Sequence, residues 1–180
     1  MCSKTWEREK EFIWKKIAVL VESLFEESEL IYPYHRLRED FEVVLVGSEK
    51  DVEYPSKSGY KVKSDISSKE ADPSEFDGVY IPGGYSPDGM RQHEATVDFV
   101  KKIHENGKPI AAVCHGPWVV ADAGLLDGVK ATSTPTIKND IVNAGAKWED
   151  SEVVVDNNII TSRSPKDLPS HVKAFVDALK

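Results

Sequence analysis

Short apolar runs alternate along the chain with longer segments in which apolar residues recur at helical spacing. The apolar runs are typical of buried strands, and the amphipathic segments predict helices. Strands are predicted at residues 17–21, 41–47, 77–81, 109–113 and 129–132. Helices are predicted after the first strand and at residues 90–106, 117–126, 137–144 and 166–180. This alternation predicts an α/β fold in which a mostly parallel sheet carries helices on both faces.

Two segments depart from this alternation and predict hairpins. Residues 52–66 alternate around a Ser-Gly pair, which indicates a small hairpin or lid. Residues 153–161 contain two apolar runs separated by Asp-Asn-Asn, and these residues tolerate the left-handed backbone of a hairpin turn. The segment 3–16 admits two interpretations, a short additional helix or a solvated extension.

The composition limits the partners that this chain can have. With 180 residues, 40% hydrophobic and 30% charged, it is long enough for a single globular domain. The formal net charge of −8 repels phosphate backbones, so we expect no nucleic-acid partner. No apolar run approaches the length that crosses a bilayer, and the charged N-terminal residues lack the apolar core of a signal peptide. We therefore expect a cytoplasmic protein with no membrane partner, whose Cys2 and Cys114 stay reduced.

The candidate chemistry centres on Cys114, which lies where one predicted strand ends and a helix begins. The strand begins at Pro109, and Pro117 suits the first position of a helix. Ala112 and Gly116 flank the cysteine at the spacing of a nucleophile elbow, with Cys in place of Ser. The N–H groups and macrodipole of a helix N-terminus favour an anion and should lower the pKa of the thiol. We predict a reactive cysteine here, rather than the inert buried cysteine that is more common.

Two further groups of residues follow predicted strands. Glu26 and Glu29 are three positions apart, a spacing that places both carboxylates on one side of a helix. Gly83 and Gly84 would let backbone N–H groups approach a ligand closely. Taken alone, the acids would suit a helix N-terminus and the glycines a tight turn. Because parallel strands end at one edge of a sheet, we expect both groups to meet Cys114 there.

A thiolate in this setting can attack a carbonyl carbon. The backbone N–H groups of His115 and Gly84 are the expected oxyanion hole, and a protonated Glu29 or Glu26 can hydrogen-bond the sulfur and shuttle a proton. The His115 side chain can be a general base, a proton carrier on the product side, or neither. Without paired Cys and His spacing, we expect no metal site, and the chemistry needs no cofactor. The other histidines are expected at the surface: His35, His93, His104 and His171.

Several stretches together resemble the PfpI/ThiJ family, which belongs to the class I glutamine-amidotransferase-like superfamily. They are FEESELIYPYHRL at 25–37, EFDG and IPGG within 75–84, GKP and CHGP within 107–117, and NAGA at 143–146. The motifs occur in order over residues 17–180, which we expect to form the PfpI/ThiJ-like domain. Residues 1–16 are then an N-terminal extension.

The resemblance implies a flavodoxin-like α/β sandwich. Family members are described as intracellular cysteine peptidases, cofactor-independent glyoxalases, protein deglycases and stress proteins. The resemblance implies Cys114 as nucleophile, His115 as its catalytic neighbour, Glu29 as the acid near the sulfur and Glu26 as the family's other glutamate. Asp88 falls where peptidase-like members have a glutamate that reaches the histidine from a neighbouring subunit, and it is one methylene shorter. The resemblance therefore also implies a homo-oligomer, a dimer or a hexamer.

Three functions fit these residues. The first is a cofactor-independent cysteine enzyme of the glyoxalase III or protein deglycase type, with a small carbonyl compound or a glycated protein or peptide as substrate. The second is an oligomeric cysteine peptidase of the PfpI type, which needs a complete Cys-His-acid triad. The third is a non-enzymatic stress protein, redox-sensing or chaperone-like, in which Cys114 is oxidised. Thr134 and Tyr85 replace a tyrosine and an arginine of relatives, so the substrate does not follow from the resemblance.

Overall fold

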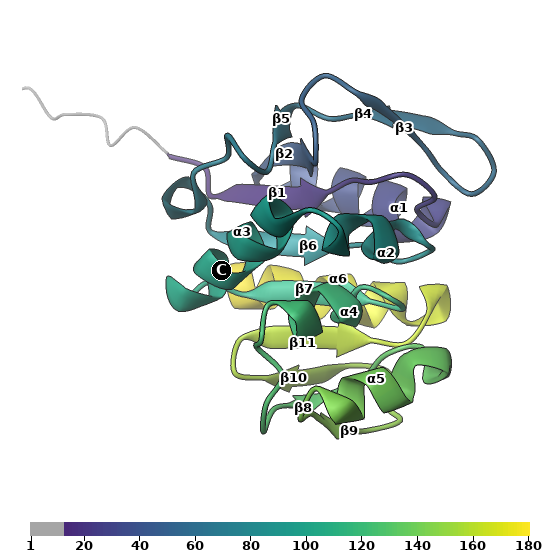
Figure 1. Cartoon of the computed structure of the whole chain (residues 1–180). Coiled ribbons are helices and arrows are strands. Elements are labelled where there is room, and N and C mark those ends of the chain that lie inside the picture. Colours follow the sequence, from purple (N-terminus) through teal and green to yellow (C-terminus); the bar gives the residue numbers. More distant parts are fainter. Residues whose placement is uncertain (1–12) are drawn as a thin grey trace, which may run out of the picture.

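The structure is a computed structural model that describes residues 13–180 (Figure 1). The predicted helix or extension at 3–16 lies outside the described residues except for positions 13–16, of which Lys16 opens β1 (Lys16–Leu20). Within the described range, no helix is both long and apolar enough to cross a bilayer.

Residues 13–180 form a central sheet of seven strands. Its order is β10-β11-β7-β6-β1-β2-β5, and all neighbouring strands are parallel except β10 and β11. This confirms the predicted mostly parallel sheet. Besides β1, its strands are β2 (Glu42–Gly47), β5 (Ile66–Ser67), β6 (Gly78–Ile81), β7 (Ile110–Val113), β10 (Val154–Asp156) and β11 (Ile159–Ser162).

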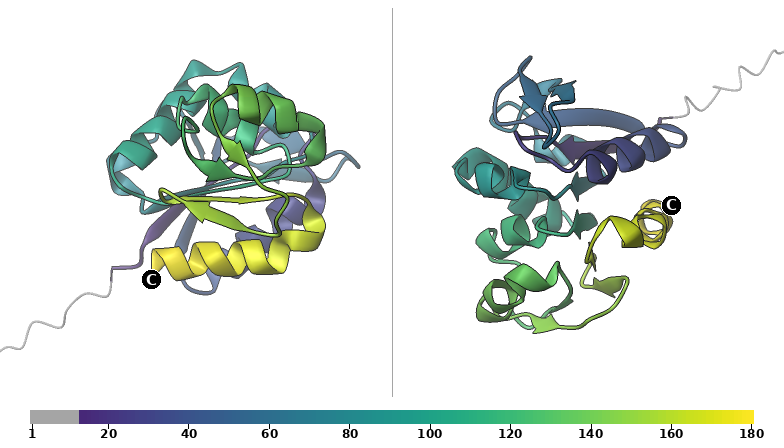
Figure 2. Two further views of the ribbon diagram at one scale, coloured as in Figure 1. Left: turned by 90° about the horizontal axis from the view of Figure 1, so that it is seen from below. Right: turned by 90° about the vertical axis from the view of Figure 1, so that its right-hand side faces the viewer.

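Helices cover both faces of the sheet, as Figures 1 and 2 show. Residues of β1 alternate between two apolar cores: Ile17 and Val19 belong to one, and Ala18 and Leu20 to the other. The first core is covered by α1 (Glu27–Arg38) and α6 (Leu168–Leu179). On the opposite face lie α2 (Ser86–Arg91), α3 (Glu94–Glu105), α4 (Pro117–Asp122) and α5 (Lys138–Asn143).

Both predicted hairpins are confirmed. The first pairs β3 (Glu53–Pro55) with β4 (Lys61–Lys63) beyond the edge of the main sheet. The second pairs β10 with β11 through Asn157 and Asn158, whose φ values of 54° and 62° are left-handed. A further pair, β8 (Lys130–Ala131) parallel to β9 (Lys147–Trp148), is not predicted from the sequence. Short 3-10 helices occur at Pro73–Glu75, Pro135–Ile137 and Pro165–Asp167.

The single helix predicted at 90–106 is wrong. The chain forms α2 and α3 instead, and His93 between them is extended, with φ −109° and ψ 103°. Met90 and Phe99 are buried in the same core, so the apolar spacing continues across the break and hides it. The loop that carries Gly83 and Gly84 is short, because α2 begins at Ser86 and Pro87 lies in its first turn.

Candidate active site

Cys114 occupies the sharp turn between β7 and α4. Its backbone is left-handed, with φ 61°, a conformation that costs a non-glycine residue on the order of 1–2 kcal/mol. The N–H of Cys114 donates to the Ser162 carbonyl and its own carbonyl accepts from the N–H of Thr134, both at 3.0 Å. A Cβ on Gly116 would lie 2.8 Å from the carbonyl oxygen of Ile81, so the turn has no room for a larger residue. The geometry is that of the predicted elbow.

Glu29, in the first turn of α1, is buried beside the cysteine. Its Oε2 accepts a hydrogen bond of 2.8 Å from the N–H of Gly83, and the hydroxyl of Tyr80 donates to its carbonyl at 2.6 Å. Oε1 is buried and makes no hydrogen bond to an N–H or O–H group of residues 13–180. The Cys114 thiol interacts with this carboxyl.

Glu26 has a different local role, because it is the N-cap of α1. Its Oε2 accepts from the N–H of Glu29 at 2.9 Å, and the hydroxyl of Ser28 donates to the same oxygen. The two carboxylates face the same cavity, as their spacing predicts, but only Glu29 is part of the helix. Glu26 precedes the helix, and Glu29 is the acid that interacts with the sulfur.

Burial raises the pKa values of both members of the pair, and a neighbouring carboxylate raises each of them further. Desolvation, followed by the charge of Glu26, raises the pKa of Glu29 to about 7. Desolvation, followed by the Glu29 carboxylate, raises the pKa of the Cys114 thiol to about 12. The predicted lowering of the thiol pKa is therefore wrong, since burial and the carboxylate outweigh the N–H groups that favour the thiolate. Near pH 7 the pair holds between one and two protons.

His115 lies within contact of the sulfur. Its Nδ1 is 3.3 Å from Sγ of Cys114, its Nε2 is 3.4 Å from Oγ1 of Thr136, and its ring centroid is 5.2 Å from that of Trp118. Burial lowers the pKa of His115, so the ring is neutral at pH 7. Within residues 13–180 no carboxylate hydrogen-bonds the ring, so the Cys-His pair lacks an acid partner in this part of the chain.

Two backbone N–H groups approach the sulfur from different loops. Those of His115 and Gly84 both hydrogen-bond Cys114 and favour its thiolate. Gly84 has a left-handed φ of 70°, and a Cβ on it would lie 2.5 Å from the backbone nitrogen of Glu26. Glycine at this position therefore allows the loop after β6 to pack against the start of α1.

These groups line a cavity of about 590 Å³ at the edge of the sheet. Most of its lining residues are predictable from the sequence, but Lys57, Thr136 and Pro165 are not among those predicted. The hairpin that carries Lys57 is predictable, but its position over the sheet edge depends on tertiary contacts. Asp88 is exposed on α2 and is not among the described residues that line this cavity.

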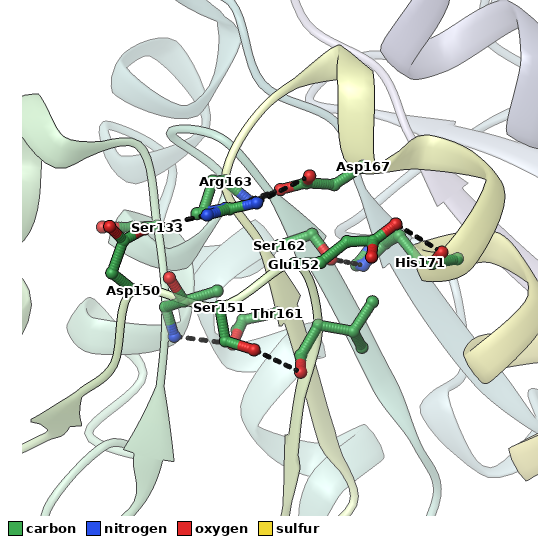
Figure 3. A network of polar contacts seen from close by, with 12 residues as sticks. Ser133, Asp150, Ser151, Glu152, Thr161, Ser162, Arg163, Asp167 and His171 are labelled. Carbon is green, nitrogen blue, oxygen red and sulfur yellow. Dashed lines mark hydrogen bonds and ion pairs between the residues drawn. The ribbon is translucent and has the colours of Figure 1, made fainter.

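A polar network adjoins the elbow, and Figure 3 shows that it includes His171. The prediction that His171 lies at the surface is wrong: its ring is fully buried, and Nδ1 is 2.9 Å from Oγ of Ser162. Burial lowers the pKa of His171 to about 3. The residue lies on the core face of α6 beside Val172, so the helix buries it with its apolar neighbours. His35 and His93 are exposed as predicted, and His104 is half-buried.

The groups around the reactive sulfur are the Cys114 thiol itself, the Glu29 carboxyl, the His115 imidazole and two backbone N–H groups. Together they can supply a nucleophile, a proton shuttle and hydrogen bonds to a developing oxyanion. Within the described range, no group of three or more His, Cys, Asp or Glu side chains is arranged to hold a metal ion.

Known proteins are similar to this chain in sequence. The DJ-1/PfpI family profile matches residues 15–178. Deglycase PfpI of Pyrococcus furiosus is 46% identical over 166 residues, which cover 92% of this chain and 99% of the relative. Putative cysteine protease YraA of Bacillus subtilis is 43% identical over 167 residues, with the same coverage of both chains.

Solved structures of related proteins have the same fold as this chain. A two-domain protein of Anabaena variabilis, with DJ-1/ThiJ/PfpI-like and ferritin-like domains, matches with a TM-score of 0.90 at 45% identity. The match covers 92% of this chain and 48% of that protein, so this chain spans about half of its length. DJ-1beta of Drosophila melanogaster matches with a TM-score of 0.85 at 27% identity, over 93% of this chain and 91% of its own.

Proposed function

Because the chain belongs to the DJ-1/PfpI family, we propose that it is a cysteine-dependent enzyme acting on reactive carbonyl compounds such as methylglyoxal, and on the early adducts that these form with proteins. The observation that carries this proposal is the interaction of the buried Glu29 carboxyl with the elbow thiol of Cys114. The deglycase name of the Pyrococcus furiosus relative supports the same substrate class.

In the first step, Cys114 attacks the aldehyde carbon of methylglyoxal. A sulfur–carbon bond forms while the thiol proton passes through Glu29 to the aldehyde oxygen, which gives a hemithioacetal. Glu29 suits this transfer because a carboxyl with a pKa of about 7 both accepts and releases a proton near neutral pH.

In the second step, Glu29 takes the proton from the carbon that was attacked, and a proton returns to the neighbouring carbon. The first carbon is oxidised and the second is reduced, so the product is a thioester of lactate and no external electron acceptor is used. Water then breaks the sulfur–carbon bond, which releases lactate and restores the Cys114 thiol. On a protein adduct, the Cys114 sulfur would instead replace the protein's amino or thiol group on the adduct carbon. The new sulfur–carbon bond forms as the carbon–nitrogen or carbon–sulfur bond of the adduct breaks, and the thiol proton passes through Glu29 to the departing group. The same hemithioacetal results, and the later steps are unchanged.

The remaining groups of the cavity support these steps. The N–H groups of His115 and Gly84, which approach the sulfur, would also donate to the carbonyl oxygen as negative charge develops on it. The neutral His115 ring, with Nδ1 3.3 Å from the sulfur, is in a position to accept a proton from the attacking water.

Peptide hydrolysis is a second candidate, favoured by the contact between His115 and Cys114 and by the name of the Bacillus subtilis relative. It requires an acid for His115, and we propose that Asp88 of a second copy supplies it within a homo-oligomer, a dimer or a hexamer. Light scattering that detects only monomer at working concentration would exclude this shared triad. For both activities we propose a cytoplasmic setting, where the thiol stays reduced.

The test of the carbonyl activity is lactate formation from methylglyoxal by purified protein without added thiol or metal. We expect turnover by the wild type and by Cys2→Ser, and none by Cys114→Ser. Circular dichroism of each variant checks that its fold is retained. If the wild type forms no lactate, the carbonyl function is wrong, and peptide hydrolysis that depends on Cys114 becomes the next assay.

A further inference from the structure

Lys57 is the cationic side chain that lines the cavity of Cys114 within residues 13–180. The imidazole of His115, which also lines it, is neutral at pH 7 because burial lowers its pKa. The charge of Lys57 lowers the pKa values of both Glu29 and His115. Its ammonium group is therefore within electrostatic reach of the reacting atoms.

The hairpin tip that carries Lys57 is tied to the start of α1. Glu27 accepts hydrogen bonds from the N–H of Ser58 at 2.8 Å and from the hydroxyls of Ser56 and Ser58. The N–H of Lys57 itself donates to the carbonyl of Phe25 at 2.9 Å. These bonds fix the backbone of Lys57 relative to the helix turn that holds the catalytic carboxyl.

Lys57 differs from the other lysines of its hairpin in its ion pairing. Lys61 pairs with Glu53 at 3.6 Å, and Lys63 pairs with Asp51 at 3.7 Å. Lys57 forms no ion pair within the described part of the chain. Its charge is thus available to a ligand.

The surroundings of Lys57 direct this charge toward the mouth of the cavity. Nζ lies 5.6 Å from the ring centroid of Tyr85, which lines the cavity from the loop after β6. The two cavity acids have other partners: Glu26 caps α1, and Glu29 accepts from the N–H of Gly83. An incoming anion would therefore meet an ammonium group that pairs with no carboxylate of residues 13–180.

We propose that Lys57 forms an anion subsite at the mouth of the Cys114 cavity, and that the preferred substrates are carbonyl compounds that carry a carboxylate. The substrate class rests on the proposed carbonyl chemistry, whereas the subsite itself does not require turnover. An ammonium group has three donors on a flexible stem and suits one carboxylate at varied angles. An α-oxoaldehyde with a terminal carboxylate, such as 4,5-dioxopentanoate, could place its anion on Lys57 and its aldehyde over Cys114.

Alkylation of Cys114 tests the subsite without turnover. Iodoacetate and iodoacetamide react alike, because in each a sulfur–carbon bond forms, a carbon–iodine bond breaks and iodide leaves, but only iodoacetate is an anion. We expect the ratio of their rate constants, iodoacetate over iodoacetamide, to fall roughly tenfold in Lys57→Met and further in Lys57→Glu. Peptide mass spectrometry separates Cys114 from Cys2, whose ratio should not change and which serves as the internal control.

Lys61→Met is the matched control, because Lys61 lies on the same hairpin, pairs with Glu53 and does not line the cavity. The iodoacetate-to-iodoacetamide ratio of Lys61→Met should stay within about twofold of the wild-type ratio. Added salt should lower the wild-type ratio and leave that of Lys57→Met unchanged. If Lys57→Met changes the iodoacetate and iodoacetamide rate constants by the same factor, Lys57 affects only the reactivity of the Cys114 thiol, and the proposed subsite is wrong.

The substrate class is tested with 4,5-dioxopentanoate and its methyl ester, which share a carbon skeleton. Wild type should prefer the acid, and Lys57→Met should lose roughly tenfold in kcat/KM for the acid, through KM, with little change for the ester. Retention of the wild-type preference in Lys57→Met would overturn this assignment. If the wild type converts neither compound nor methylglyoxal, the carbonyl function fails, and the alkylation ratio still decides the subsite.

Discussion

The backbone N–H of Gly83 donates a hydrogen bond of 2.8 Å to Oε2 of Glu29, which lies 54 residues earlier in the chain. This bond joins the loop after β6 to the first turn of α1. It holds one oxygen of the carboxyl, while Oε1 has no N–H or O–H partner among residues 13–180. The carboxyl that interacts with Cys114 is therefore positioned by a residue that has no side chain.

Gly83→Ala should abolish activity while most of the fold remains. A Cβ at this position would overlap Oε2 of Glu29 and lie 2.8 Å from Cβ of Cys114, so the carboxyl must move away from the sulfur. We expect a loss of kcat of roughly 100-fold or more, the scale of a lost proton shuttle. The overpacking should cost about 1–3 kcal/mol of unfolding free energy.

The control for this variant is Gly107→Ala. Gly107 has a left-handed φ of 73°, and a Cβ there would contact nothing within 4 Å. The backbone strain should cost about 1–2 kcal/mol, so the two variants have similar stability but different activity. Equal activity losses in both would show that Gly83 acts on stability alone.

Glu29→Gln should stabilise the fold above neutral pH. The pKa of Glu29 rises from 4.5 to about 7 in the fold, so the folded state holds this proton more tightly than the unfolded state does. Wild-type stability therefore falls as pH rises from about 4.5 to about 7, by about 3 kcal/mol in total, and the penalty is complete above that range. Urea unfolding at about pH 4 and about pH 8 measures it. If the difference in unfolding free energy between Glu29→Gln and wild type is the same at both pH values, this explanation is contradicted.

His171→Asn should make the fold more resistant to acid. Burial lowers the pKa of His171 from 6.5 to about 3, and the Asp167 carboxylate opposes this shift without cancelling it. Stability is full above about pH 6.5 and is lost as pH falls toward about 3, by about 5 kcal/mol in total. The Asn side chain can donate to or accept from the Ser162 hydroxyl and cannot be protonated. In urea unfolding, the free energy of unfolding of His171→Asn relative to that of wild type should rise steadily as pH falls below about 6.5. A difference between the two proteins that does not change with pH would contradict the prediction.

Much of the fold is predictable because its signals are local. The apolar run at 17–21 and the Asn157-Asn158 turn each carry their own conformational preference, and both appear in the structure as predicted. The break at His93 has no such signal, since residues on both sides of it face one core. The burial of His171 is also a tertiary effect, because it depends on which face of α6 meets the sheet.

The candidate site also has features that the local sequence predicts and features that depend on tertiary contacts. The elbow at Cys114 follows from small residues close in sequence, and strand order brings Gly84 and Glu29 to it. Spacing alone does not separate the capping acid Glu26 from the buried acid Glu29. The raised thiol pKa and the position of Lys57 depend on burial and on hairpin placement, which the local sequence does not encode.

The most direct test of the Cys114–Glu29 pair is the pH dependence of kcat/KM for methylglyoxal in wild type and Glu29→Gln. Because the pKa of Glu29 is about 7 and that of the thiol about 12, the pair loses its first proton near pH 7. Wild-type kcat/KM should therefore rise through an apparent pKa near 7 and then level off. Glu29→Gln should be roughly 100-fold slower and should lack that rise. A Glu29→Gln enzyme with the wild-type rate and pH profile would contradict the proposed mechanism.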